Sequence, residues 1–198
     1  MFAWVKSKKP YVPKPYEQMT YPGQRVQIDV KHVPASCLVG EAKGKKFYQY
    51  TAIDEYSRIR CLGAFEEAST YTSALFLKYA AAYFKKKGFD IECVQTDNGS
   101  EFTNRFNHIT KDKLTHFEVA ADNMGINRKL IRPYTPRHNG KVERSHREDN
   151  KRFYLSHRFY SFKDFEKLLA VHLNRANNIP MRPLGWLSPL EFLLVQLV

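Results

Sequence analysis

Three acidic residues stand at positions from which a fold could aim their side chains at one place. Asp29 falls on the polar side of the alternating run 25–30. Asp97 comes directly after the short apolar run 91–96, and Glu143 lies near the start of a basic helical segment. Three carboxylates that converge repel one another, so they stay ionised together only with cations between them. Hard oxygen ligands favour Mg²⁺ or Mn²⁺, and two such ions support the cleavage and transfer of phosphodiester bonds.

Each acid taken alone is more typical of a strand edge, a turn or a solvated helix, so the elements that carry them decide the interpretation. Alternating and β-branched runs predict strands, and capping residues predict helix starts. We expect strands at 25–30, 46–53, 59–65, 91–96 and 127–132, and helices at about 70–87, 115–125 and 138–157, with two more starting at Ser161 and Ser188. In the first helix, Leu75, Tyr79, Ala82 and Tyr83 fall at helical spacing and predict its apolar side.

This order of elements predicts an α/β domain. Three antiparallel strands, extended by parallel strands through helical crossovers, form a mixed five-stranded sheet flanked by helices. The order is that of a ribonuclease H-like fold, in which the first and fourth strands are neighbours. Asp29 and Asp97 could then face each other, and the long helix would bring Glu143 to the same place.

Composition divides the chain into three parts. Residues 1–20 are rich in Pro and lack periodicity, which is typical of an extended arm or linker. Residues 21–160 carry the predicted sheet, and residues 161–198 form a short helical C-terminal extension. The sequence contains no signal peptide, no apolar run of membrane-spanning length and no CxxC motif. We therefore expect an intracellular protein, cytoplasmic or at the nucleoid if the source is bacterial, with no membrane partner, zinc module or disulfide framework.

Positive charge is concentrated in one segment. The net charge of the chain is +12, and the segment 128–158 alone has ten Lys or Arg against three Asp or Glu, a net +7. Such a cluster is typical of a nucleic-acid-binding surface, and a solvated basic helix is the alternative. The expected phosphate contacts are Lys141, Arg144, Arg147 and Lys151, with Arg147 on the helix face that carries Glu143.

Other polar residues near the acids have simpler interpretations. Asp54 follows the second strand, and a turn or ion-pair role is favoured over metal binding. Glu101 is interpreted as structural, and Asn98 as a residue that supports its acidic neighbour. The segment 136–140 is expected to be a mobile loop that orders on substrate, and its His138 could contact substrate, assist proton transfer or be a plain loop residue.

Four segments resemble the retroviral-integrase-like catalytic core that is shared with insertion-sequence transposases of the DDE type. They are 22–29 (PGQRVQID), 52–58 (AIDEYSR), 95–102 (QTDNGSEF) and 133–144 (PYTPRHNGKVER). The resemblance covers about residues 21–160, and its last two segments are the most specific. A departure is the interval between Asp97 and Glu143, which at 45 residues is longer than is usual in the family and places an insertion at about 106–114.

This resemblance implies that Asp29, Asp97 and Glu143 are a triad that binds two Mg²⁺ or Mn²⁺ ions when DNA is bound. It also implies an enzyme that cleaves DNA at an element end and then joins the 3′-hydroxyl to target DNA, acting as a homo-oligomer on DNA. Two alternatives stay open. One is a ribonuclease H-type nuclease on the same fold, and the other is a catalytically silent DNA-binding or assembly module.

Overall fold

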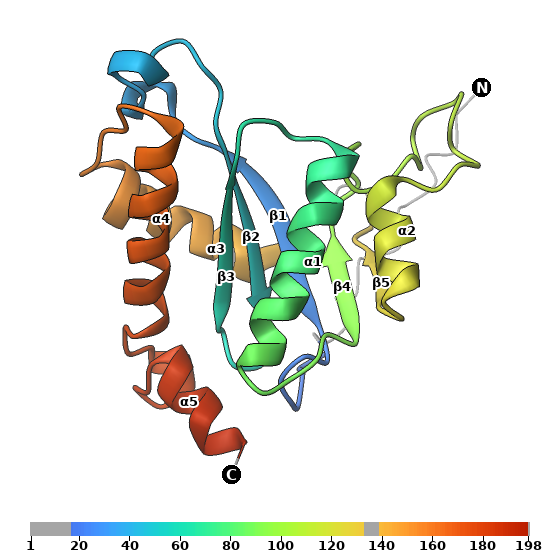
Figure 1. Cartoon of the computed structure of the whole chain (residues 1–198). Helices are drawn as coiled ribbons and strands as arrows, with labels where there is room; N and C mark the ends of the chain where they lie inside the picture. Colours follow the sequence, from blue (N-terminus) through green and yellow to red (C-terminus); the bar gives the residue numbers. More distant parts are fainter. Residues whose placement is uncertain (1–16, 133–138, 198) are drawn as a thin grey trace, which may run out of the picture.

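The computed structural model describes residues 17–132 and 139–197. At its centre is a single five-stranded sheet with the order β3-β2-β1-β4-β5. β1 pairs antiparallel with β2 and parallel with β4, which confirms that the first and fourth strands are neighbours. β2 and β3 are antiparallel, and β4 and β5 are parallel. The strands are β1 (Val26–His32), β2 (Tyr48–Asp54), β3 (Arg60–Phe65), β4 (Cys93–Thr96) and β5 (Asn127–Leu130) (Figure 1).

Five α-helices surround the sheet, and three of them begin with a capping box. Ser69 caps α1 together with Thr72, and Thr115 caps α2 together with Glu118. Ser188 caps α5 in the same way, while Ser161 caps α4 by accepting from the Asp164 N–H. The helix predicted to run to residue 157 ends earlier and continues as a π-helical turn, Asn150–Tyr154. The helices are α1 (Thr70–Lys86), α2 (His116–Asn123), α3 (Gly140–Asp149), α4 (Phe162–Asn177) and α5 (Pro189–Gln196).

One face of the sheet carries an apolar core. Val26 and Ile28 of β1 are fully buried there against α1, which crosses this face (Figure 1). The predicted helix is present, although two of the residues whose spacing indicated it, Leu75 and Tyr79, are 40% and 50% exposed. The buried side is formed by Phe76, Leu77, Ala80 and Phe84. Apolar residues occur at helical spacing on both sides of this helix, so spacing alone could not choose between them.

The opposite face of the sheet is covered by α3 and α4 and combines a second apolar cluster with buried polar residues. Phe165 and Leu169 of α4 are buried in this cluster together with Leu62 of β3. α4 belongs to the region predicted as a C-terminal extension, residues 161–198. It is nevertheless packed on β3, so it shares a core with the sheet.

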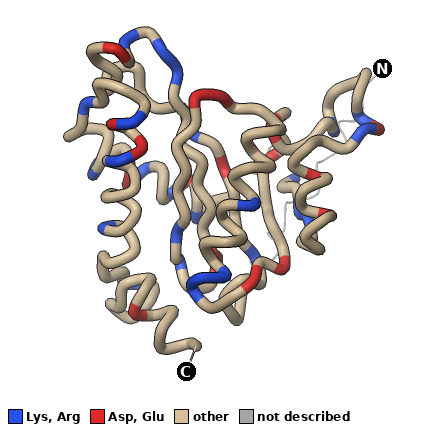
Figure 2. The backbone as a smooth tube through the Cα atoms, viewed as in Figure 1, with Lys and Arg blue, Asp and Glu red and all other residues tan. Residues whose placement is uncertain are grey.

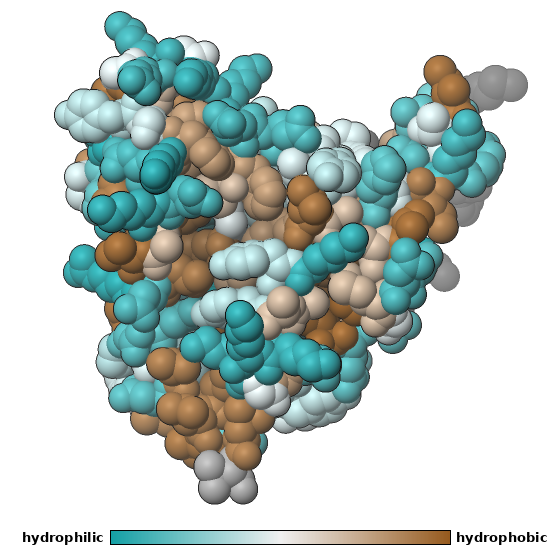
Figure 3. All heavy atoms as spheres, viewed as in Figure 1, coloured by the Kyte–Doolittle hydropathy of each residue, from teal (hydrophilic) through white to brown (hydrophobic). Residues whose placement is uncertain are grey.

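The ends of the chain fall partly outside the described residues. The predicted arm lies there for residues 1–16, as do His138 and the segment 133–138 of the loop that precedes α3. Near the C-terminus, apolar side chains remain on the surface around α5, where Figure 3 shows a hydrophobic area. Within the described part, no helix is both long and apolar enough to cross a membrane.

Candidate active site

Asp29 and Asp97 lie at the same level on neighbouring strands. The parallel register of β1 and β4 places Gln27 opposite Gln95, and each aspartate follows its glutamine by two residues. Side chains two residues apart share one face of a strand, so Asp29 points away from the apolar core. Asp97 comes directly after the last residue of β4, where the Gly99 N–H donates to its Oδ1 (2.9 Å).

Glu143 lies in the first turn of α3, and its side chain is exposed. This helix packs against β1 and β2 on the polar face of the sheet. The three predicted acids therefore come from one strand, one strand end and one helix that all border this face.

Negative charge from these acids converges on Asp29. Burial, the neighbouring Asp97 and, to a smaller extent, Glu101 and Glu143 together raise the pKa of Asp29 to about 7, against a hydrogen bond from the Val30 N–H that lowers it. In the part of the chain that the structure describes, no three His, Cys, Asp or Glu residues are close enough together to hold a metal ion. The all-oxygen donor set and its unbalanced charge nevertheless fit hard divalent cations, which would offset the repulsion. The triad therefore stays a prediction as a set of ligands.

Glu101 is a fourth acid in this group, and sequence analysis gave it only a structural role. Burial raises its pKa, and Asp97 adds to the effect. The carboxylate of Glu101 folds back over Gly99, where a Cβ atom would meet it at 2.6–2.7 Å. Its position four residues after Asp97 is the signal that could have indicated its proximity.

A buried hydrogen-bond network holds the start of α3 against the sheet. The Gln27 Oε1 accepts from the backbone N–H groups of Lys141 and Val142 (3.2 and 3.0 Å). N–H groups at a helix start have no acceptor within their own helix, so these bonds cap α3. The Gln27 Nε2 donates to Glu55 (2.9 Å), which also accepts from Arg25 (2.7 Å) and from the Lys141 Nζ (2.9 Å). The turn of α3 that carries Glu143 is thereby tied to β1.

The four basic residues predicted to contact nucleic acid differ in their surroundings. Arg144, Arg147 and Lys151 are exposed on α3 and on the turn that follows it. Lys141 is only 19% exposed in its side chain and is paired with Glu55. The first three stay predicted phosphate contacts, whereas Lys141 joins α3 to the sheet. Lys and Arg are distributed over much of the described backbone (Figure 2).

His146 lies one turn after Glu143 and contacts Asp29. Its Nδ1 is 3.4 Å from the Asp29 Oδ2, and its Nε2 is 3.0 Å from the Thr51 Oγ1. Burial lowers the pKa of His146 to about 4, so the ring is neutral at pH 7. Sequence analysis assigned it no role beyond the face that it shares with Glu143.

The structural role predicted for Asp54 is confirmed. Its carboxylate is fully buried and accepts from the Gly23 N–H (2.9 Å), the Ser57 N–H (2.6 Å) and the Ser57 hydroxyl (2.7 Å). These bonds close the turn that follows β2. The Asn98 Nδ2 donates to the Ile131 carbonyl (3.0 Å), so it ties the Asp97 turn to the end of β5.

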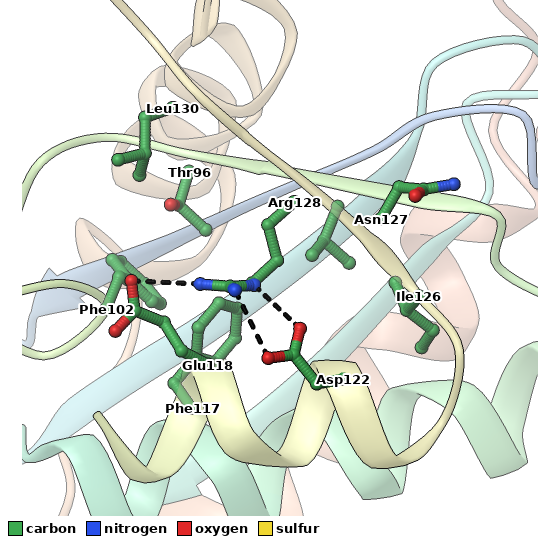
Figure 4. A pocket seen from close by; sticks show the side chains of 10 residues that line it. Thr96, Phe102, Phe117, Glu118, Asp122, Ile126, Asn127, Arg128 and Leu130 are labelled. Atoms are coloured by element: carbon green, nitrogen blue, oxygen red, sulfur yellow. Dashed lines mark hydrogen bonds and ion pairs between the residues drawn. The ribbon is translucent and has the colours of Figure 1, made fainter. Parts of the chain in front are cut away.

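A cavity of about 400 Å³ opens between α2 and the β4–β5 edge, but the candidate acids do not line it. Its floor includes Phe102 and Phe117, and Arg128 crosses it to reach Glu118 (3.0 Å) and Asp122 (3.1 Å) (Figure 4). The guanidinium is held by both acids, so the cavity is partly filled by an internal ion pair.

The sheet order and the flanking helices define a ribonuclease H-like fold, and comparisons with known proteins identify the family. A model described as "Integrase core domain" matches residues 20–136, and a second model of that description matches residues 124–189. A protein of Spiroplasma virus SpV1-C74 that is named as an integrase, ORF3, is 30% identical over 180 residues. The match covers 82% of this chain and 48% of that relative, so the chain spans about half its length.

Solved structures support the same assignment of the fold. The catalytic core domain of BIV integrase has a TM-score of 0.58 at 19% identity, with 87% of this chain and 95% of that chain covered. The HTLV-2 integrase catalytic core domain in complex with magnesium has a TM-score of 0.60 at 15% identity, with 87% and 97% covered. A chain of the simian T-cell lymphotropic virus intasome, solved in complex with PP2A regulatory subunit B56 gamma, has a TM-score of 0.66 at 17% identity, with 89% and 56% covered.

The chain belongs to the integrase core domain family. The family models together reach from residue 20 to residue 189, so they extend past α3 into the C-terminal helices. This agrees with the shared core that joins α4 to the sheet.

Proposed function

We propose that the chain is the catalytic core of an enzyme that cleaves and joins DNA in integration or transposition, with Asp29, Asp97 and Glu143 holding Mg²⁺ or Mn²⁺. The observation that carries this proposal is the sheet register that brings Asp29 beside Asp97 on the face where α3 packs with Glu143 in its first turn. Membership of the integrase core domain family supports it, as does the magnesium in the HTLV-2 core. The intasome among the structural neighbours supports DNA as the partner and a homo-oligomer as the assembly.

Each group of residues has a distinct task in this mechanism. When bound, the two cations activate the attacking oxygen and stabilise the leaving one. Asp29 and Asp97 provide oxygen ligands from a rigid sheet, while Glu143 adds a third from the exposed start of α3. Arg144, Arg147 and Lys151 bind phosphates and orient the DNA backbone toward the acids. Removing each phosphate contact should flatten the log–log salt dependence of binding by about one unit.

Replacing Glu143 with Gln tests the proposal. The change keeps the size of the side chain but removes its charge, and the exposed position means that the fold should survive. Glu148→Gln is the matched control, because Glu148 lies on the same helix and only pairs with Arg152 at the surface (3.0 Å). The assay follows reversal of the joining step on a branched DNA substrate with Mg²⁺ or Mn²⁺, since the forward reaction could require a further domain.

We expect Glu143→Gln to bind DNA as well as the wild type does and to lose nearly all turnover, while Glu148→Gln stays active. Wild-type turnover in Glu143→Gln would mean that Glu143 is not a ligand. A wild-type protein that cleaves RNA–DNA hybrids but does not act on branched DNA would favour a ribonuclease H-type nuclease. DNA binding without turnover under any of these conditions would favour an assembly module.

A further inference from the structure

A chain of buried hydrogen bonds runs from the interior of the protein to His146, whose ring faces Asp29. It begins at Asp149, which is fully buried near the end of α3, and passes to the Gln49 Nε2 (2.7 Å). The same amide nitrogen donates to the Thr51 Oγ1 (3.0 Å). Thr51 then meets the Nε2 of His146, whose Nδ1 faces Asp29. Thr51 and Asp29 are also direct partners in the β1–β2 register.

We propose that the donors in this series of hydrogen bonds all point one way and hold His146 as the Nδ1–H tautomer. His146 is then a positioning residue that orients the Asp29 carboxylate. The structural part of the proposal stands alone. Its catalytic meaning rests on the proposed function of Asp29.

The direction is set at Asp149. Burial alone would raise the pKa of Asp149, but Arg60, His172 and Gln49 hold it below its usual range. Asp149 is therefore ionised at neutral pH and can only accept hydrogen bonds. Gln49 must turn its NH₂ group toward it, and the Gln49 carbonyl then accepts from the Tyr154 hydroxyl (2.6 Å).

The next two hydrogen bonds follow from the number of hydrogens that the Gln49 amide and the Thr51 hydroxyl can donate. The second N–H of Gln49 donates to Thr51, so the Thr51 hydroxyl keeps its own hydrogen for another acceptor. Thr51 is fully buried, and within the described residues the Nε2 of His146 is the one acceptor that meets it. Because Nε2 accepts, it carries no proton, and the ring proton of His146 therefore lies on Nδ1.

Asp29 is consequently held through both of its oxygens. The Val30 N–H donates to Oδ1 (2.9 Å), and the His146 Nδ1 approaches Oδ2 (3.4 Å). These two contacts restrict the plane of the carboxylate and leave further lone pairs for a cation. A neighbouring donor of this kind orients a ligand without binding the metal itself.

The tautomer can be read directly by nitrogen NMR. Protein labelled with ¹⁵N-histidine is recorded at about pH 8, above the ordinary pKa of histidine, and the His146 signals are assigned by their loss in His146→Gln. Thr51→Val removes the hydroxyl but keeps the shape of the side chain, and Thr51→Ser restores the hydroxyl. Tyr50→Phe is the matched control, because it deletes another buried β2 hydroxyl, which bonds Thr72 (2.8 Å) on the opposite face.

We expect the wild type, Thr51→Ser and Tyr50→Phe to show the Nδ1–H form, and Thr51→Val to shift toward the Nε2–H form. In the branched-DNA assay, Thr51→Val should lower kcat by about 10–100-fold, the usual cost of losing a partner of a metal ligand. Thr51→Ser and Tyr50→Phe should keep kcat.

An Nε2–H form in the wild type, or an unchanged tautomer in Thr51→Val, would overturn the proposal. A shifted tautomer with an unchanged kcat would overturn the positioning role. The tautomer is read without turnover, so a wild type that shows the Nδ1–H form but no activity would count against the proposed function alone.

Discussion

The two faces of β1 hold the molecule together in different ways. On one face, Val26 and Ile28 pack into an apolar core under α1. On the other, Gln27 accepts hydrogen bonds from the start of α3, and Asp29 faces His146 of the same helix. Apolar burial is roughly proportional to area and has no direction, whereas hydrogen bonds fix distances and angles. The comparison indicates that β1 is held on its α1 face by apolar burial, whereas on its α3 face polar contacts set the geometry of the site.

The largest expected effect of a change on the α3 face is a loss of activity without a loss of stability. Asp29→Asn should reduce turnover on branched DNA by more than about 100-fold, since losing a ligand should exceed the loss of one of its partners. Without divalent ions at about pH 8, the same variant should be as stable as the wild type or more so, because burial and Asp97 disfavour the charged form of Asp29.

Two measurements on Asp29→Asn decide the point. Turnover is compared with that of Asp122→Asn, a surface acid that pairs with Arg128, and stability is measured by urea unfolding. A variant that loses stability and keeps turnover would reverse the roles assigned to the two faces.

The next effect in size concerns the buried ion pair under α3. Arg60 donates to both oxygens of Asp149, and both side chains are almost fully buried. Arg60→Leu should lower the free energy of unfolding by about 3–5 kcal/mol, because it leaves Asp149 with an uncompensated charge. The double variant Arg60→Leu with Asp149→Leu should recover part of this loss, as determined by denaturant unfolding. Additive losses in the double variant would mean that Arg60 and Asp149 contribute independently, so that the orphaned charge is not the cause of the loss.

The same carboxylate predicts a pH dependence that belongs to the α3 face. Asp149 has a pKa below its ordinary value of 3.8 in the folded state. Such a group stabilises the fold above pH 3.8, and this contribution is lost as the pH falls through 3.8 toward the folded pKa. The free energy of unfolding in urea should therefore fall more steeply below about pH 4 for the wild type than for Asp149→Asn. Parallel curves for the two proteins would contradict the depressed pKa.

The sequence contains enough information to predict the sheet and its apolar side. Alternation in β1 separates Val26 and Ile28 from Gln27 and Asp29 because strand side chains alternate between faces. The capping boxes at Thr115 and Ser188 are local, so they too can be recognised from the chain alone.

The arrangement of the polar face could not be predicted in the same way. Lys141 donates to Glu55, which is 86 residues away in sequence, and no local pattern encodes such a pair. From sequence alone, Lys141 near Glu143 fits a phosphate contact as well as it fits an ion pair with Glu55. His172 on α4 illustrates the same limit. Its Nε2 lies 2.8 Å from the Asp149 Oδ1, and the tertiary fold alone brings these two atoms together.

The smallest expected effect comes from a change on the apolar face of β1, next to Asp29 in sequence. Ile28 precedes Asp29 in β1, is fully buried and packs in the α1 core. Ile28→Val removes one methylene group there, which should lower the free energy of unfolding by about 0.5–1.5 kcal/mol. Because the loss involves no titrating group, the variant should shift the whole pH–stability curve without changing its shape. Turnover per folded molecule should stay at the wild-type value, since the change faces away from Asp29. A fall in kcat beyond the loss of folded protein would mean that packing under α1 also sets the position of the carboxylate, and the division of tasks between the two faces would then fail at the strand where they meet.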